Sequence, residues 1–189
     1  MAAEPKQRIA LIEASLGGAR GNSRVLADRA HAALAGSARI DRLVLANRPG
    51  FVRHQKALER ASGFVFCTGT YWDSWSSHLQ RFLEEATPHE ATSLWLGKPA
   101  IVLVTEHSVG GKGVVSRLSG VLSTFGCLLP PMGGLVISKA AMLARPADPD
   151  FFGLPDVDIA CANLLAALHR APYRAWSVDR RDATRRWLP

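Results

Sequence analysis

Apolar residues are arranged along this chain in two alternating patterns. The first is a short, nearly continuous apolar run, clearest in residues 99–105, where Ile-Val-Leu-Val follows Pro99 and Ala100. Runs of this length with β-branched residues predict strands that are buried on both faces. Five such strands are expected, at residues 8–14, 39–46, 63–68, 99–105 and 128–138.

Between these runs, apolar residues follow helical spacing. Residues 74–86 place Trp75, Leu79 and Phe82 on one helical face, and Gly126 stands where a C-terminal cap would end the fourth helix. A strict alternation of strands and helices predicts one α/β domain, whose parallel sheet is covered by helices on both faces. The expected helices cover residues 22–36, 51–60, 74–86, 112–125 and 156–170, with a loop around residues 140–155.

In such a sheet, ligands bind beyond the carboxyl ends of the strands, so the loops after strands one, three and four matter most. The first of these loops runs from Ser15 to Ser23 and contains glycines, Arg20 and Asn22. Backbone N–H groups and the helix dipole favour an anion at a helix start, and arginine adds a planar donor. We expect Asn22 or Ser23 to cap the helix; a plain glycine turn is the alternative to a phosphate site.

The loop after the third strand carries three aromatic residues within five positions, at Tyr71, Trp72 and Trp75. Aromatic side chains there can flank a flat heteroaromatic ring while backbone groups bond its polar edge. The alternative is a cluster in the core or at a subunit contact. We favour that alternative for Trp75, and a ligand wall for Tyr71 and Trp72.

The loop after the fourth strand covers residues 105–113 and combines glycines with the polar tips of Thr105, His107 and Ser108. Its glycines permit close backbone approach to a ligand. A mobile surface turn that caps the next helix is an equally good interpretation. Glu106 and His107 are adjacent in sequence and could suggest an acid–base pair. Side chains of adjacent residues need not face one another, so the sequence alone does not establish such a pair.

The absence of three known sequence motifs narrows the class of ligand that the chain could bind. Glu106 stands where the first glycine of a P-loop ending in Gly111-Lys112 would fall, which argues against a nucleotide triphosphatase. The first loop lacks the G-x-G-x-x-G fingerprint of dinucleotide-binding folds, and no G-x-S-x-G elbow of serine hydrolases occurs. A ligand with a single phosphate group fits the remaining pattern best.

The cysteines and histidines show no metal-binding spacing. Cys67, Cys127 and Cys161 are scattered, so we expect reduced and mostly buried thiols rather than disulfides or a zinc site. The histidines outside the fourth loop are interpreted as surface or helix residues, at positions 31, 54, 78, 89 and 169.

The net charge of +7 is concentrated near the C-terminus, where six arginines and two aspartates follow His169. A basic tail at residues 174–189 after a domain at residues 1–173 is therefore expected, docked on a partner or solvated, and nucleic-acid binding is not expected. No apolar run reaches the roughly 20 residues that span a bilayer, and no signal-peptide core is recognisable, which predicts a cytoplasmic protein without a membrane partner.

At these loops the chain resembles the NAD(P)H-dependent FMN reductases of the flavodoxin-like superfamily. Residues 68–76 (Thr-Gly-Thr-Tyr-Trp-Asp-Ser-Trp-Ser) are similar to the family segment T-P-x-Y-W-x-S-x-S, which lines the isoalloxazine ring. Gly-Asn-Ser at residues 21–23 resembles the phosphate loop, and residues 97–100 with Gly110 resemble the fourth strand and the third flavin loop. The similarity spans roughly residues 8–138, estimated from the order of elements.

The sequence departs from the family pattern at several positions. Gly69 replaces the usual proline, Gln80 and Arg81 stand where a lysine is usual, and Leu16 occupies a position that is usually proline or arginine. The first loop is also longer than the corresponding loop of the family, so Arg20 is displaced from the position of the family's arginine. These departures affect the expected phosphate contacts more than the fold.

The resemblance implies a flavodoxin-like three-layer sandwich with strand order 2-1-3-4-5 that binds FMN without a covalent bond. FMN would accept hydride from NADPH or NADH and reduce a small acceptor such as a quinone or free flavin, with no side chain as an obligatory catalytic acid or base. A homodimer or higher homo-oligomer is usual in the family. The implied phosphate ligands are Ser15, Arg20, Asn22 and Ser23, and the implied neighbours of the ring and ribityl chain are Thr70, Tyr71, Trp72, Asp73, Thr105, His107 and Gly110.

Two other functions remain open from the sequence. One is a flavodoxin-type electron carrier, although a pI near 9.9 fits poorly with carriers that dock through acidic surfaces. The other is a binding or regulatory protein that keeps the fold without flavin.

Overall fold

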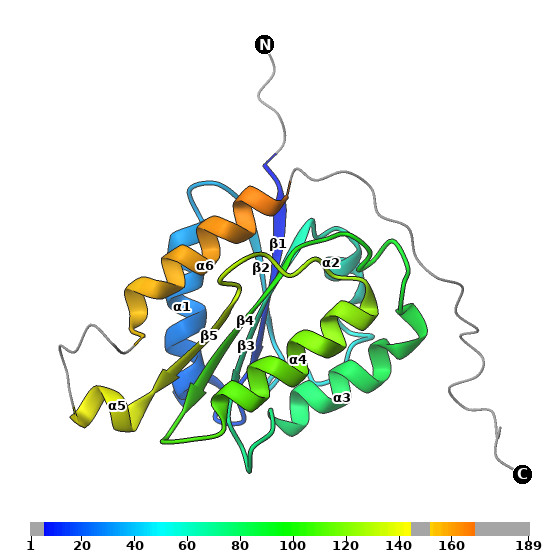
Figure 1. Cartoon of the computed structure of the whole chain (residues 1–189). Helices are drawn as coiled ribbons and strands as arrows, with labels where there is room; N and C mark the ends of the chain where they lie inside the picture. Colours follow the sequence, from blue (N-terminus) through cyan, green and yellow to red (C-terminus); the bar gives the residue numbers. More distant parts are fainter. Residues whose placement is uncertain (1–5, 145–151, 169–189) are drawn as a thin grey trace, which may run out of the picture.

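The sheet has five parallel strands in the order β2-β1-β3-β4-β5, as expected. The computed structural model describes residues 6–144 and 152–168 (Figure 1). The central strand β3 is buried at every position, in agreement with its uninterrupted apolar run. The strands are β1 (Arg8–Ala14), β2 (Arg39–Val44), β3 (Gly63–Gly69), β4 (Ala100–Glu106) and β5 (Gly134–Ser138).

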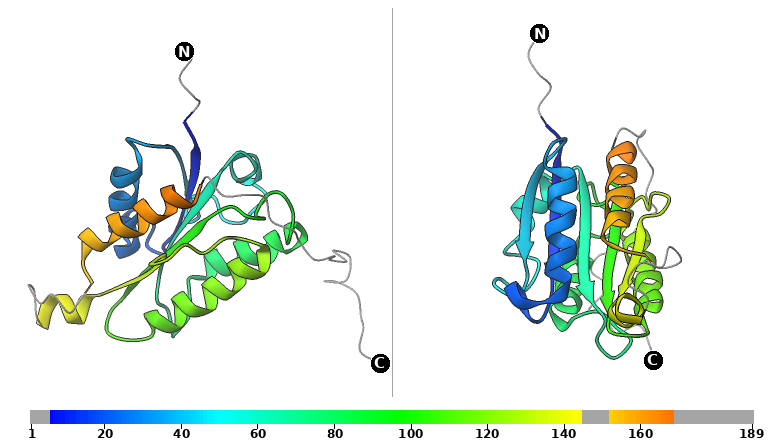
Figure 2. Two further views of the ribbon diagram at one scale, coloured as in Figure 1. Left: turned by 45° about the horizontal axis from the view of Figure 1, so that its top comes forward. Right: turned by 90° about the vertical axis from the view of Figure 1, so that its left-hand side faces the viewer.

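Helices cover both faces of the sheet and complete the three-layer sandwich. α1 and α6 lie side by side over one face, which is turned toward the viewer in the right panel of Figure 2. α2, α3 and α4 pack on the other face. The helices are α1 (Asn22–Leu34), α2 (Gln55–Glu59), α3 (Ser77–Ala86), α4 (Gly111–Phe125), α5 (Lys139–Ala144) and α6 (Leu154–Ala167), with 3-10 turns η1 (Gly18–Arg20) and η2 (Thr87–His89).

The two cores differ in composition. The face under α2, α3 and α4 is aromatic, with Trp95 fully buried against Phe64 and Phe125 at centroid distances of 4.8 and 5.4 Å. The face under α1 and α6 uses small residues such as Ala27 and Ala160, which let these helices approach the strands closely. Both cores end at the carboxyl edge of the sheet, which leaves that edge for the loops.

Several boundaries differ from the sequence-based expectation. The third helix begins at Ser77 rather than at residue 74, because Ser76 accepts a hydrogen bond from Leu79 N and caps it. β5 begins at Gly134 rather than at residue 128; Leu128 pairs with Pro99 only as an isolated bridge before Pro130 and Pro131, which cannot donate to a ladder.

Other differences are smaller. α2 covers only the second half of residues 51–60, and α6 starts at Leu154 rather than at residue 156. α5 falls within the segment expected to be a loop. The basic tail at residues 174–189 and the domain end at residue 173 lie outside the described residues.

All three cysteines are free and buried, as expected. Burial raises the pKa of the Cys161 thiol to about 12 and also raises the pKa of the Cys67 and Cys127 thiols. These groups stay protonated at neutral pH, and a protonated thiol is a poor nucleophile. We expect iodoacetamide to leave the folded protein unmodified and to alkylate all three cysteines in denaturant, as measured by intact mass; alkylation of the folded protein would contradict this burial.

Among the described helices, none is both long and apolar enough to cross a bilayer.

Candidate functional site

The three loops singled out in the sequence meet at one edge of the sheet. β1, β3 and β4 are adjacent and parallel, so their carboxyl ends lie together at the lower edge of Figure 1. The residues expected at the site lie in the loops that follow these strands, at the end of β4 (Thr105) and in the first turn of α1 (Asn22 and Ser23).

The first loop turns tightly before α1 begins. Ser15 follows β1 directly, and η1 leads to Gly21, which is the N-terminal cap residue of α1. The expectation that Asn22 or Ser23 caps this helix is wrong: both lie inside its first turn, and no side chain caps it. The Ser15 hydroxyl packs against Gly21 so closely that a Cβ at position 21 would collide with it.

Two hydroxyls at this helix start are buried without a hydrogen-bond partner in the described part of the protein. Ser15 and Ser23 are each only 1% exposed, and both Oγ atoms are unpartnered. An unsatisfied buried hydroxyl costs about 1–3 kcal/mol, so such groups usually mark a missing ligand or solvent molecule. Together with an uncapped helix start, they form a donor-rich recess suited to an anion.

Arg20 and Asn22 lie at the rim of this recess rather than inside it. The side chains of Arg20 and Asn22 are both exposed. The Arg20 guanidinium makes no ion pair with any residue the structure describes. Arg20 is therefore free to bind an anion from the solvent side, whereas the serine hydroxyls lie on the protein side.

The third loop is a tight hairpin turn. Tyr71 and Ser74 exchange backbone hydrogen bonds of 2.7 and 3.0 Å, and Trp72 and Asp73 both have positive φ, at 49° and 57°. This is the type I′ geometry, which glycine and asparagine adopt more easily than tryptophan. Trp72 is 101% exposed at the tip. Backbone strain of this kind in non-glycine residues often accompanies function.

Tyr71 joins the third loop to the first. Its hydroxyl accepts a hydrogen bond of 3.2 Å from the backbone N–H of Leu16. Its ring lies over Gly69, where a Cβ would come within 3.1 Å of the ring. Glycine at position 69 thus leaves room for the tyrosine ring, and Tyr71 connects the two loops.

Loops three and four are in direct contact at Gly110. This residue has φ 95° and caps α4, and a Cβ there would overlap Asp73 Oδ1 and approach Thr70. Thr70 N also donates to Thr105 O at 2.8 Å, while its own Oγ1 is buried and unpartnered within the described residues. The structure therefore brings Thr70, Asp73, Thr105 and Gly110 together, and Thr70 offers a third unsatisfied hydroxyl.

The acid–base pair suggested by neighbouring Glu106 and His107 does not form. Glu106 Oε2 accepts a hydrogen bond of 2.6 Å from Gly111 N, so this carboxylate serves the start of α4. The His107 side chain is exposed, and its backbone carbonyl accepts from Ala140 N at 2.7 Å. His107 can border a ligand without acting through Glu106.

The structure agrees with the structural role expected for Trp75 and differs from the expectation for one histidine. Trp75 packs partly buried against the core under α3, and its indole donates to Gln80 at 2.8 Å. His54 is an exception to the expected surface or helix position, because it precedes α2, is 7% exposed and is bonded to Arg48 O; His169 lies outside the described residues. The described residues contain no group of side chains that could hold a metal ion.

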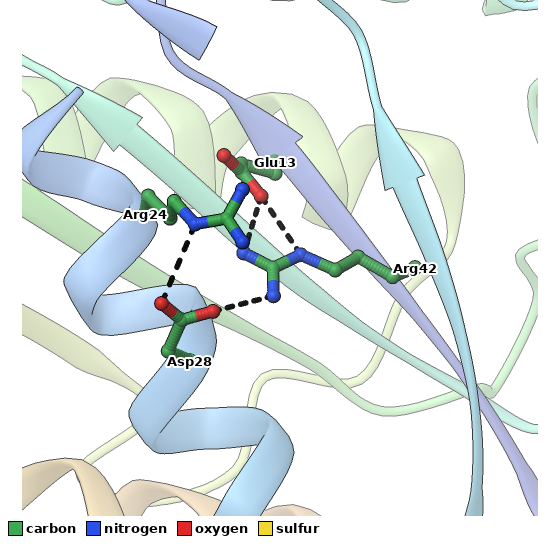
Figure 3. Close-up of polar contacts among 4 residues, drawn as sticks. All are labelled: Glu13, Arg24, Asp28 and Arg42. Atoms are coloured by element: carbon green, nitrogen blue, oxygen red, sulfur yellow. Dashed lines mark hydrogen bonds and ion pairs between the residues drawn. The ribbon is translucent and has the colours of Figure 1, made fainter. Parts of the chain in front are cut away.

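A charge network built on the buried Glu13, close to the first loop, was not predicted (Figure 3). Glu13 is fully buried on β1, and its Oε2 accepts from Arg42 Nε at 2.8 Å and Nη2 at 2.5 Å. Arg42 also bonds Asp28 of α1, which lowers the pKa of the Asp28 carboxyl, and Arg24 pairs with Asp28 at 3.5 Å. The network ties β1 and β2 to α1; its sequence signals were a glutamate within the first strand and an arginine within the second.

Comparisons with known proteins agree with this geometry. The family described as NADPH-dependent FMN reductase matches residues 7–142. Among solved structures, RosB with a bound formyl derivative of riboflavin 5′-phosphate aligns with TM-score 0.70 and 13% identity, covering 87% of this chain and 79% of that one. The apo NADH:FMN oxidoreductase EmoB aligns with TM-score 0.69 and 16% identity over 88% and 92% of the two chains.

A third structure is FerB, an NAD(P)H:acceptor oxidoreductase from Paracoccus denitrificans, with TM-score 0.64 and 18% identity over 86% and 95% of the chains. At such identities the likeness shows a shared fold. No curated protein sequence matches the chain.

Proposed function

Because the chain belongs to the NADPH-dependent FMN reductase family, and is by that membership a flavin-dependent oxidoreductase, we propose that it passes reducing equivalents from NADPH or NADH through bound FMN to a small acceptor. A quinone or free flavin is the acceptor class we expect. FMN, when bound, supplies the hydride and electron transfer, and the chain's own residues bind and orient the reactants.

The observation that carries this proposal is the set of three buried hydroxyls without partners among the described residues. Ser15 and Ser23 at the start of α1 fit a phosphate, with Arg20 and Asn22 closing the outer side. The unpartnered Thr70 hydroxyl lies one strand away, in the direction of the expected ring and ribityl chain. Tyr71, Trp72, Asp73, Thr105, His107 and Gly110 would border that part of the ligand.

The positions of Tyr71 and Trp72 suggest different roles in that site. Tyr71 is held between two loops by its bond to Leu16 N, so it would form a fixed wall. Trp72 is fully exposed on a tight turn and would contribute from the outer side, next to the acceptor. No described carboxylate bonds His107, which is consistent with binding rather than acid–base work.

A phosphate held by Ser23 predicts a measurable loss of cofactor affinity in Ser23→Ala. Removing one hydrogen bond to a charged group should weaken FMN binding by about tenfold or more. Titration of flavin fluorescence against the apoprotein measures the dissociation constant. Ser116→Ala, on α4 and away from the first loop, is the matched control and should bind FMN like the unmodified protein.

Two assays of the purified protein, NADPH oxidation and flavin binding, distinguish the alternative functions. Steady oxidation of NADPH with a quinone acceptor supports the reductase. Flavin binding without such turnover would favour an electron carrier, and protein that stays colourless with added FMN would favour a flavin-free binding protein. Homodimer formation and a cytoplasmic location remain predictions from the resemblance and the sequence.

A further inference from the structure

A separate cavity adjoins the fourth loop on the side away from α1. Its volume is about 680 Å³, and it lies between the start of α4, the end of β5 and α5. Pockets of about 300–1,000 Å³ are typical of small-molecule sites. Its lining includes Ser108, Gly110, Lys112, Val136, Ala141 and Phe152.

The cavity shares its boundary with the proposed flavin site. Gly110 lines the cavity and also contacts Thr70 and Asp73 from the third loop. A ligand that fills the cavity would therefore lie beside whatever occupies the edge of β3 and β4. This position suits the distal part of a long substrate whose reactive end meets the flavin.

One accessible positive charge borders the cavity, at Lys112. Lys112 is exposed in the first turn of α4 and has no ion pair with any described residue. The carboxylate that also borders the cavity, Glu106, is already bonded to Gly111 N at 2.6 Å. Lys112 is therefore the charged side chain of the cavity that a ligand phosphate can reach from solvent.

The shape of the cavity favours a flat aromatic group. Phe152 lines it and is still 54% exposed, which is unusual for a large apolar side chain. Small residues from the start and end of α5 also line it, at Ala140, Ala141 and Ala144. A planar ring could stack on Phe152 without displacing any large side chain.

We propose that this cavity binds the adenosine end of the nicotinamide dinucleotide, with adenine on Phe152 and a phosphate on Lys112. The proposal rests on the proposed function, because it assigns a place to the substrate of that reaction. The phosphate on Lys112 would be the 2′-phosphate that distinguishes NADPH from NADH.

Calorimetric titration with two fragments tests this assignment: adenosine 2′,5′-bisphosphate, and AMP, which lacks the 2′-phosphate. We expect the bisphosphate to bind the purified protein and to compete with NADPH in turnover. Lys112→Ala should weaken the bisphosphate about tenfold and leave AMP nearly unchanged, since a charge-assisted bond is lost. Phe152→Ala should weaken both fragments by about fivefold through lost stacking.

Two matched variants control for general effects. Arg117→Ala removes one charge from the exposed side of the same helix, and Ile159→Ala removes an exposed apolar side chain of α6; neither residue lines the cavity. Both should bind the fragments like the unmodified protein. Equal losses in Lys112→Ala and Arg117→Ala, equal losses of both fragments in Lys112→Ala, or no binding of the bisphosphate would overturn the proposal.

The fragments contain no nicotinamide and need no flavin, so the two proposals can fail separately. Protein that turns over NADPH but does not bind the bisphosphate contradicts this inference and leaves the reductase function intact. Protein that binds the bisphosphate with the expected variant pattern but no FMN supports the cavity assignment and contradicts the proposed function.

Discussion

Replacing Arg42 by methionine should lower the free energy of unfolding by about 3–5 kcal/mol, because it leaves the carboxylate of Glu13 buried without its partner. Glu13 is fully buried, and no other described side chain bonds its Oε2. Urea denaturation monitored by far-UV circular dichroism measures the change. A loss below about 1 kcal/mol would show that Glu13 does not depend on this arginine.

Two further variants separate burial from charge in that experiment. Arg81→Met breaks an exposed pair with Glu85 on α3 and should cost less than about 1 kcal/mol. The double variant Glu13→Leu with Arg42→Met removes both partners and should recover much of the stability, since an apolar pair often replaces a buried ion pair without loss. A double variant as unstable as Arg42→Met would indicate that the bond from Arg42 to Asp28 carries the effect.

Replacing Gly21 by alanine should weaken FMN binding by about tenfold to one hundredfold. The added Cβ would overlap the Ser15 hydroxyl and force it, with the turn η1, out of the recess at the start of α1. Loss of one or two hydrogen bonds to a phosphate has an effect of this size. Flavin fluorescence titration gives the affinity, and thermal unfolding of the apoprotein shows whether the fold is intact.

The chain offers a matched control for that variant. Gly36 follows the same helix, a Cβ added there would meet no atom within 4 Å, and its φ is not positive. Gly36→Ala should leave FMN affinity unchanged. Unchanged affinity in Gly21→Ala as well would mean that the phosphate is held elsewhere.

The sequence could predict those parts of the fold that follow from local periodicity. The apolar run before Glu106 and the helical stripe through Leu118 and Leu122 are each readable within one element, and both are confirmed. The alternation of these elements is sufficient for a parallel sheet, and the resemblance supplied the strand order. The predicted boundaries of helices were wrong where a single contact sets the boundary, as at Ser76, whose hydroxyl caps α3.

The parts of the site that could not be predicted depend on contacts between distant segments. The bond from Tyr71 to Leu16 joins positions 55 residues apart, and the collision that requires glycine at 110 involves Asp73 of another loop. Glu13 reads as one polar residue in an apolar run, and nothing local shows that Arg42 lies opposite. The sequence therefore predicts which loops meet at the candidate site but not how their side chains contact one another.

The hydroxyls of Ser15 and Ser23 have a consequence for how long this protein lasts in a cell. On the proposed assignment, a bound phosphate gives both hydroxyls a charged acceptor and so stabilises the folded protein. Ligand binding lowers the unfolded fraction on which chaperones and proteases act. Cofactor shortage would then reduce the amount of this protein by faster degradation, so its abundance would follow cofactor supply without any change in gene expression.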